Sequence, residues 1–202
     1  PLVEVIIRQA LHSKLRRNIY LSSDSDEILS LANNYDVIKI KRPDEFATDN
    51  ARSEDAIIHL LKYSLKTNNP DLVILLEPTA PLRRLNDIDE SITSFINQKA
   101  DSMFSGAYLD DFLIWKKSDE GNLNSINYNY KIQGPRQKRK PDIVENGALY
   151  LFKPDIIINN SNRFGGKICL FENEFWQSFE IDNIEDWKFV ELIYKTYINY
   201  TF

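Results

Sequence analysis

Short apolar segments alternate with longer amphipathic segments through the first hundred residues of the chain. The helix-like segments are 2–14, 24–35, 53–67 and 85–99, and the strand-like segments are 18–23, 37–41 and 72–76. A strand, a crossover helix and a second strand form a right-handed unit that places the two strands parallel in one sheet. The alternation therefore predicts an α/β fold with a mostly parallel sheet flanked by helices.

The second half of the chain has a different pattern. Residues 102–115 alternate apolar and polar side chains, and residues 119–122 (DEGN) have the composition of a hairpin turn. Three strand-like segments and a closing helix follow, at 148–152, 167–171, 178–182 and 184–197. We expect a single domain over residues 1–202, with an extended β-hairpin region over residues 102–141. The basic run at 136–140 (RQKRK) is either a solvated loop or an anion site.

Composition excludes several classes of function. The net charge of −5 argues against non-specific binding to nucleic acid. The one cysteine, Cys169, cannot form an internal disulfide, and its apolar surroundings (KICLF) predict a core residue. No apolar run approaches the ~20 residues that span a bilayer, and no signal-peptide pattern opens the chain, so we expect a cytoplasmic protein. The two histidines are far apart, which makes a zinc site improbable.

Three polar segments interrupt this apolar framework. In LLEPTAPLR (75–83) an apolar strand ends in a loop with two prolines, which either terminates the strand or forms a substrate-binding loop. RPDEFATDNARSED (42–55) leads into a helix start at Ser53, and its small residues leave room for a flat ligand against the backbone. In ENGALYLF (145–152), Asn146 and Gly147 either make a turn or orient a polar ligand.

The segment SFEID (178–182) carries a possible metal site. In a strand, Glu180 and Asp182 would point to the same face. Mg²⁺ usually takes one or two protein carboxylates together with substrate phosphates, so the pair suits this ion. The alternative makes Asp182 a helix cap and Glu180 a solvent-facing residue, and the spacing alone favours that alternative.

Six stretches, taken in order, resemble the acylneuraminate cytidylyltransferase family, which activates sialic acid and related nonulosonic acids. They are YLSSDSDEI, RPDEFATDNA, LLEPTAPLR, GPRQ, ENGALYLF and EIDNIEDW, and they span nearly the whole chain. The resemblance implies a Rossmann-like fold of the nucleotide-diphospho-sugar transferase type. It also implies a nucleotidyltransferase, in which the anomeric hydroxyl of a 2-keto sugar acid attacks the α-phosphate of CTP and displaces pyrophosphate. Cell-surface glycans such as lipopolysaccharide or capsule would receive the activated sugar.

The resemblance also assigns roles to individual residues. The residues implied at the CTP site are Arg42, Ala51 and Ser53. Those implied at the sugar site are Glu77, Arg136, Gln137, Asn146, Tyr150 and Phe164, with Arg136 pairing with the sugar carboxylate. Glu180 and Asp182 would hold Mg²⁺, and Arg136 and Asp182 would be the catalytic residues. The family further implies a homodimer, in which the 102–141 region reaches into the partner's active site.

Three departures from the family pattern keep alternatives open. Glu77 stands where the family usually has glutamine, and a carboxylate there would repel a sugar acid unless it is protonated or paired. Glu180 stands in place of the first metal aspartate. The first strand and phosphate-binding loop of the family are absent from the sequence, so we do not expect efficient turnover from this chain. The alternatives are another sugar (legionaminic, pseudaminic or Kdo-like) and an inactive dimerisation or regulatory module.

Overall fold

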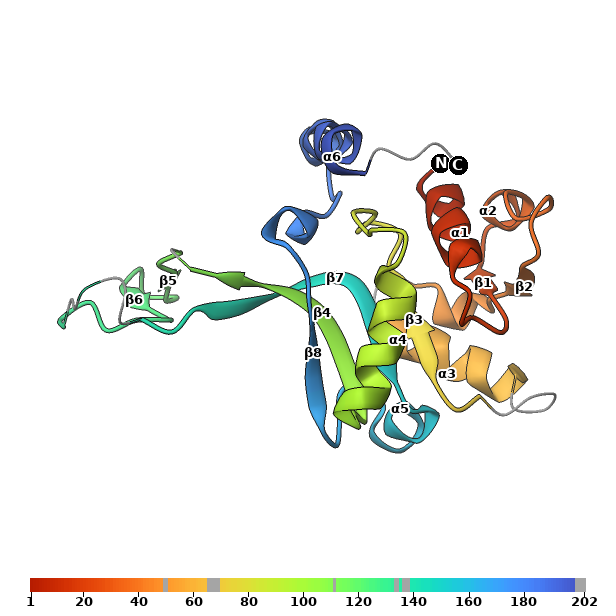
Figure 1. Ribbon diagram of the computed structural model, residues 1–202, viewed down its shortest axis with the longest axis horizontal. Helices are drawn as coiled ribbons and strands as arrows, with labels where there is room; N and C mark the ends of the chain where they lie inside the picture. Colours follow the sequence, from red (N-terminus) through yellow and green to blue (C-terminus); the bar gives the residue numbers. More distant parts are fainter. Residues whose placement is uncertain (49–50, 65–69, 111, 133–134, 136–138, 199–202) are drawn as a thin grey trace.

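The main sheet of the protein has four strands in the order β3-β7-β4-β8. The computed structural model describes residues 1–48, 51–64, 70–110, 112–132, 135 and 139–198 (Figure 1). The strands are β3 (Val73–Leu75), β4 (Ser102–Leu109), β7 (Asp142–Phe152) and β8 (Ile168–Glu172). β7 is antiparallel to both β3 and β4, while β4 and β8 are parallel. Three of the four strands thus run the same way, which confirms the mostly parallel sheet.

A second, two-stranded sheet pairs β1 (Tyr20–Ser23) with β2 (Ile38–Lys41) in parallel. The helix between them, α2, runs only from Asp26 to Ser30, whereas the sequence predicted a helix over 24–35. Ser25 caps its start by accepting a hydrogen bond from the Ile28 amide at 3.3 Å. The segment after Ser30 forms turns instead of helix, because asparagines 33 and 34 are poor helix formers.

Helices cover both faces of the main sheet. The long helices are α1 (Leu2–His12), α3 (Ser53–Ser64), α4 (Asp87–Gln98) and α6 (Ile184–Tyr197), and α5 (Pro154–Asn160) is shorter. Alternation along β7 divides the core, since Leu149 and Leu151 pack with α4, while Tyr150 and Phe152 pack with α3 and α5. Cys169 is buried in the α4 cluster, as the sequence predicted. The result is an α/β/α arrangement.

The predicted hairpin turn is confirmed. β5 (Trp115–Lys117) and β6 (Leu123–Ser125) pair antiparallel, and Gly121 takes a positive φ of 89° in the turn between them. The hairpin lies at the end of a long extension of β4 and β7 that reaches away from the body of the molecule (Figure 1). We call residues 110–141 the arm. Its exposed apolar side chains are Phe112, Leu113, Ile114, Trp115, Leu123, Ile126, Tyr130 and Ile132.

The strand predicted at 178–182 is wrong. A short 3-10 helix, η3 (Phe175–Ser178), ends on the first residue of that segment, and the residues after it form no strand. Glu174 and Gln177 form a reciprocal capping box, which favours the helical turn over a strand. One backbone hydrogen bond, from the Ile181 amide to the Thr79 carbonyl at 2.8 Å, ties this segment to the 77–83 loop. Throughout the described ranges, no helix is both long enough and apolar enough to cross a membrane.

Candidate active site

The loop at 77–83 is fixed from beneath by a buried arginine. The Arg83 side chain has 0% exposure and donates from Nε to the Ala148 carbonyl at 2.7 Å, from Nη2 to the Glu77 carbonyl at 2.8 Å and from Nη1 to Gln9 Oε1 at 3.0 Å. Gln9 in turn donates to the Pro81 carbonyl at 2.8 Å. Hydrogen bonds therefore attach the loop to both α1 and β7, so that its backbone forms a rigid platform. Its prolines prevent β3 from continuing as a strand.

On this platform the Glu77 carboxylate is paired. Arg163, which follows α5, lies between Glu54 of α3 and Glu77, with Nε 2.8 Å from Glu54 Oε1 and Nη1 3.4 Å from Glu77 Oε1. The guanidinium also lies over the Tyr150 ring, with Cζ 4.4 Å from the centroid. Burial acts to raise the pKa of Glu54, but hydrogen bonds from Arg163 and from the backbone, together with the charges of Arg163 and Arg52, lower that pKa overall. The repulsion expected from an unpaired Glu77 is thus partly relieved by a residue that the sequence analysis did not select.

Further carboxylates surround the same place. Burial, followed by the charges of Asp182, Glu77 and Glu145, raises the pKa of Glu180. Glu180 lies directly against Gly147, where a Cβ would be 2.5 Å from Glu180 Oε1, and Gly147 has a positive φ of 65°. Glycine at 147 is therefore required both for the backbone conformation and for the room that Glu180 occupies.

Tyr150 and Phe164 form the apolar side of the site. Their rings meet edge-on at 6.0 Å, and Phe164 also meets Phe104 edge-on at 5.8 Å. The Tyr150 hydroxyl donates to Glu145 Oε1 at 2.5 Å, and burial together with this hydrogen bond raises the pKa of Tyr150. The tyrosine therefore stays neutral and serves as a hydrogen-bond donor and a ring surface.

Asn146 is buried beneath the site, with 1% exposure. Its Oδ1 accepts from Ser105 Oγ at 2.6 Å and from the Ala148 amide at 3.2 Å, and its Nδ2 donates to Asn173 Oδ1 at 2.9 Å. These bonds lie where the register of β4 and β7 shifts after Phe104. The amide supports this bulge, and a direct contact with a sugar stays a prediction.

The predicted magnesium ligands fit that ion in number and charge. In the part of the chain that the structure describes, no three His, Cys, Asp or Glu side chains gather as a self-sufficient metal site. Mg²⁺ does not need three, because water and substrate phosphates complete its coordination around one or two carboxylates. Glu180 and Asp182 supply two carboxylates on one short segment, and after burial the charge of Asp182 is the next cause of the raised pKa of Glu180.

The residues predicted at the CTP site follow β2 and precede α3. Arg42 pairs with Asp24 (Nη2 to Oδ1, 3.4 Å), but its Nε is buried without a hydrogen-bond partner among the described residues. The Ser22 hydroxyl of β1 is also buried without a hydrogen-bond partner among the described residues. Ala51 is half-buried, and Ser53 is exposed at the first residue of α3. Unsatisfied buried donors on β1 and directly after β2 are consistent with a ligand site there.

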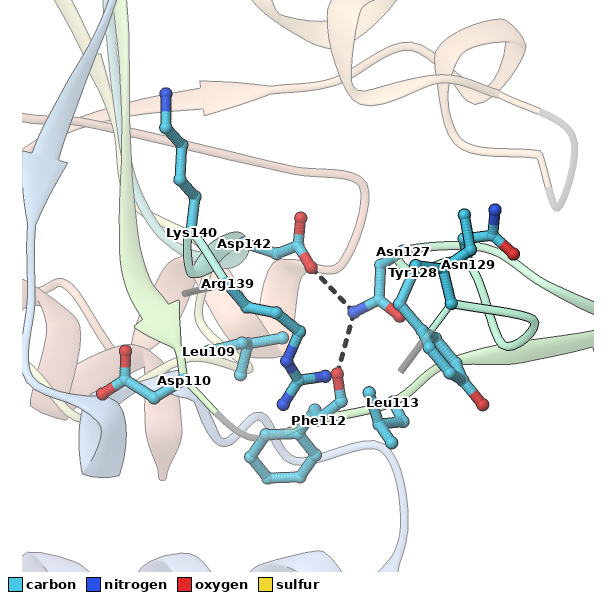
Figure 2. A pocket seen from close by; sticks show the side chains of 11 residues that line it. Leu109, Asp110, Phe112, Leu113, Asn127, Tyr128, Asn129, Arg139, Lys140 and Asp142 are labelled. Carbon is cyan, nitrogen blue, oxygen red and sulfur yellow. Dashed lines mark hydrogen bonds between the residues drawn. The ribbon is translucent and has the colours of Figure 1, made fainter. Parts of the chain in front are cut away.

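Two predicted site residues, Arg136 and Gln137, lie outside the described residues. The nearby Arg139 and Lys140 line a separate cavity of about 360 Å³ at the base of the arm. Figure 2 shows the Asn127 amide there, donating to the Phe112 carbonyl at 2.8 Å and to Asp142 Oδ2 at 2.7 Å. Asp110 and Asp142 also line the cavity, so its charge is mixed and the predicted anion site stays untested.

Solved structures of low sequence identity share this fold. CMP:2-keto-3-deoxy-manno-octonic acid synthetase, solved with CTP, superposes with a TM-score of 0.70 over 97% of this chain and 88% of that one, at 11% identity. 4-Diphosphocytidyl-2C-methyl-D-erythritol synthase also gives a TM-score of 0.70, over 95% and 89%, at 8% identity. The fold is thus an α/β nucleotidyltransferase fold, as predicted.

Sequence comparison gives the family. The model of the Cytidylyltransferase family matches residues 1–193, so the chain belongs to the cytidylyltransferase family. It is 27% identical to N-acylneuraminate cytidylyltransferase A of Danio rerio over 95% of this chain. It is 29% identical to post-translational flagellin modification protein B of Campylobacter coli, over 94% of this chain and 82% of that protein. It is also 29% identical to CMP-N,N'-diacetyllegionaminic acid synthase of Campylobacter jejuni, over 93% of this chain and 81% of that protein. The chain spans only 44% of the Danio rerio protein.

Proposed function

We propose that the protein transfers CMP from CTP to the anomeric hydroxyl of a nonulosonic, sialic-acid-like sugar acid. The observation that carries this proposal is that Glu77 and Tyr150 contact Arg163, that the Phe164 ring meets Tyr150, and that Glu180 is close enough to Glu77 to be affected by its charge. These residues come from four segments, and all but Arg163 were selected from the family resemblance. In the reaction, the anomeric oxygen bonds to the α-phosphorus, the bond from that phosphorus to the bridging oxygen breaks, and pyrophosphate leaves. The activated sugar would serve cell-surface glycans.

The chain's own residues would bind and orient the two substrates. Mg²⁺, held by Glu180 and Asp182, would neutralise the phosphate charge. Arg42, Ala51 and Ser53 would hold the cytidine, and the buried Arg42 Nε would find its acceptor there. The remaining sugar-site residues are proposed to be Glu77, Arg136, Gln137, Asn146, Tyr150 and Phe164. The fixed backbone of the 77–83 loop favours this positioning, because a platform that does not reorganise preserves the alignment of the reacting groups.

Nucleotide binding is the first test. Titration calorimetry with Mg²⁺ is expected to give CTP a dissociation constant at least roughly tenfold below that of UTP, because a site that hydrogen-bonds one base edge leaves polar groups unpaired with another. Arg42→Met should weaken CTP binding by about tenfold, the value of one charge-assisted hydrogen bond. Lys188→Met, at an exposed position of α6, is the control. Equal binding of CTP and UTP would contradict the proposed base site.

The arm supports a homodimer, and it also favours the second candidate function, an inactive dimerisation or regulatory module. Its exposed side chains include Leu123 at 63% exposure and Ile132 at 75%. Light scattering is expected to give twice the 23.6 kDa chain mass at micromolar concentration. Leu123→Asp should shift the protein toward monomer, whereas Ile184→Asp, at an equally exposed apolar position on α6, should not. A monomeric wild type would contradict the dimer.

A further inference from the structure

Arg163 is held by more than one acidic residue, and the two contacts are unequal. Its Nε lies 2.8 Å from Glu54 Oε1, while its Nη1 lies 3.4 Å from Glu77 Oε1. The side chains of Arg163 and Glu54 are 14% and 15% exposed, and that of Glu77 is 28% exposed. Glu54 is therefore the inner, shorter contact, and Glu77 is the outer carboxylate, which is more exposed to solvent.

The Tyr150 ring restricts the guanidinium further. Arg163 Cζ lies 4.4 Å from the ring centroid, and Tyr150 is itself fixed by its hydrogen bond to Glu145 and by the Phe164 ring. A planar guanidinium stacked on an aromatic face has few orientations left. Glu54 and Tyr150 thus hold Arg163 in place from two sides without any help from Glu77.

The ion pair with Arg163 reduces the electrostatic effect of the negative charge on Glu77. Glu77 belongs to a group of carboxylates around Glu180, whose pKa is raised by the charges of Asp182, Glu77 and Glu145 in addition to burial. In the described ranges, the ion pair that Glu77 makes is the one with Arg163. Unpaired, Glu77 would add a full negative charge to a place that a sugar acid must approach. Because Glu77 pairs with Arg163 through Oε1, its Oε2 can still accept a hydrogen bond, and the paired carboxylate repels a sugar acid less than an unpaired one would.

We infer that Glu54, Arg163 and Glu77 form a specificity relay on the sugar side of the site. Glu54 positions Arg163, Arg163 neutralises and orients Glu77, and Glu77 Oε2 accepts a hydrogen bond from an uncharged donor of the sugar acid, a hydroxyl or an amide N–H. The inference rests on the proposed function. It assigns Glu54 and Arg163 as positioning residues and makes Glu77 the residue that contacts substrate. Substrates that present a second anionic group at this point are excluded by the surrounding carboxylates.

The test measures CMP transfer from CTP to a sugar acid by the protein. The probes are N-acetylneuraminic acid and N,N'-diacetyllegionaminic acid, and the better of the two is carried forward. Arg163→Met should raise the KM for the sugar acid roughly 10- to 100-fold and leave the KM for CTP within about twofold, because the uncovered Glu77 charge acts on the sugar side. Adding Glu77→Gln to Arg163→Met should restore the sugar KM to within about fivefold of wild type, since glutamine keeps the acceptor without the charge.

Two single variants separate charge from hydrogen bonding. Glu77→Gln alone should change the sugar KM by less than about fivefold, whereas Glu77→Met should raise it at least tenfold, because methionine has a similar length and no acceptor oxygen. Lys188→Met, which removes an exposed ion pair on α6, should change neither KM. Equal values for Glu77→Gln and Glu77→Met would overturn the role of Oε2.

A stability measurement separates failure of the relay from failure of the proposed function. If wild type transfers CMP to neither probe, the proposed function fails, and the pairing is then judged by thermal unfolding. Arg163→Met should lower the Tm by roughly 4–10 °C, and the added Glu77→Gln should recover part of that loss. A double variant that is no better than Arg163→Met in both KM and Tm would overturn the relay. Recovery of Tm without recovery of KM would show a purely structural pair and would overturn the specificity role.

Discussion

Asp182→Asn is expected to reduce Mg²⁺-dependent CMP transfer by at least about 10³-fold while moving the Tm by less than about 2 °C. Asparagine keeps the shape of the side chain but removes the charge that a hard cation requires, and losing several kcal/mol of charge stabilisation gives a rate effect of this size. Asp182 is exposed, and it is its backbone amide that bonds to the α6 cap at Asp186, 3.0 Å away. The fold should therefore tolerate the change. Pyrophosphate release measured across a Mg²⁺ titration gives the result.

The neighbouring exposed carboxylate at the start of α6 supplies the matched control. Glu185→Gln removes one negative charge three residues away in sequence and should leave turnover within about twofold. Unchanged turnover in Asp182→Asn would remove Asp182 from the metal site. A large loss of turnover in Glu185→Gln would instead mean that metal binding depends on the overall negative potential of this region and not on one particular carboxylate.

The other proposed metal ligand, Glu180, makes the stability of the protein depend on pH. Its pKa is raised in the folded protein, first by burial and then by the surrounding carboxylates, so its contribution to stability is fully present below the unfolded pKa and is lost as the pH rises through the folded pKa. Above the folded pKa the ionised side chain is therefore unfavourable to folding. The same negative charge would attract a cation, so Mg²⁺ bound at Glu180 would be expected to stabilise this part of the protein.

The alternation of segments was sufficient to predict the α/β class, but it could not give the direction of every strand. β7 carries the most apolar run of the second half, and the sequence marks its strand at 148–152 without saying that it inserts antiparallel between β3 and β4. That choice depends on which sheet edges are free, which is a property of the whole fold. At 178–182 the alternation of SFEID predicted a strand, but Ser178 ends η3, and the Ile181 amide bonds to the Thr79 carbonyl of a loop, which offers no strand to pair with.

Only part of the candidate site could be predicted from the sequence, because contacts between distant segments leave no local pattern. Residues within motifs, such as Glu77, Tyr150 and Phe164, could be selected by resemblance, and the structure brings them together near Arg163, while their roles stay a prediction. Arg163 could not be selected, because its partners Glu54 and Glu77 are 109 and 86 residues away in sequence and no local pattern marks such a pair. The charge of Glu77 signalled that a partner was needed without indicating which residue it is.

Arg83 carries the largest expected effect on stability. Arg83→Met should lower the free energy of unfolding by roughly 3–5 kcal/mol, or the Tm by about 8–15 °C, because the guanidinium is fully buried and its removal leaves polar groups without donors. The groups affected include the carbonyls of Ala148 and Glu77 and the amide oxygen of Gln9. Methionine fills part of the volume but donates to none of them.

The adjacent arginine provides the control for that experiment. Arg84 makes an ion pair with Glu174 and lies over the Trp176 ring, but its side chain is 49% exposed, so Arg84→Met should cost no more than about 1 kcal/mol. Urea unfolding of both variants measures the difference. Equal and small effects would mean that the 77–83 loop holds its conformation through its prolines alone. A large effect confined to Arg83 would mean that the buried cation builds the platform on which Glu77 meets Arg163, and activity should then fall with stability in Arg83→Met even though Arg83 never touches a substrate.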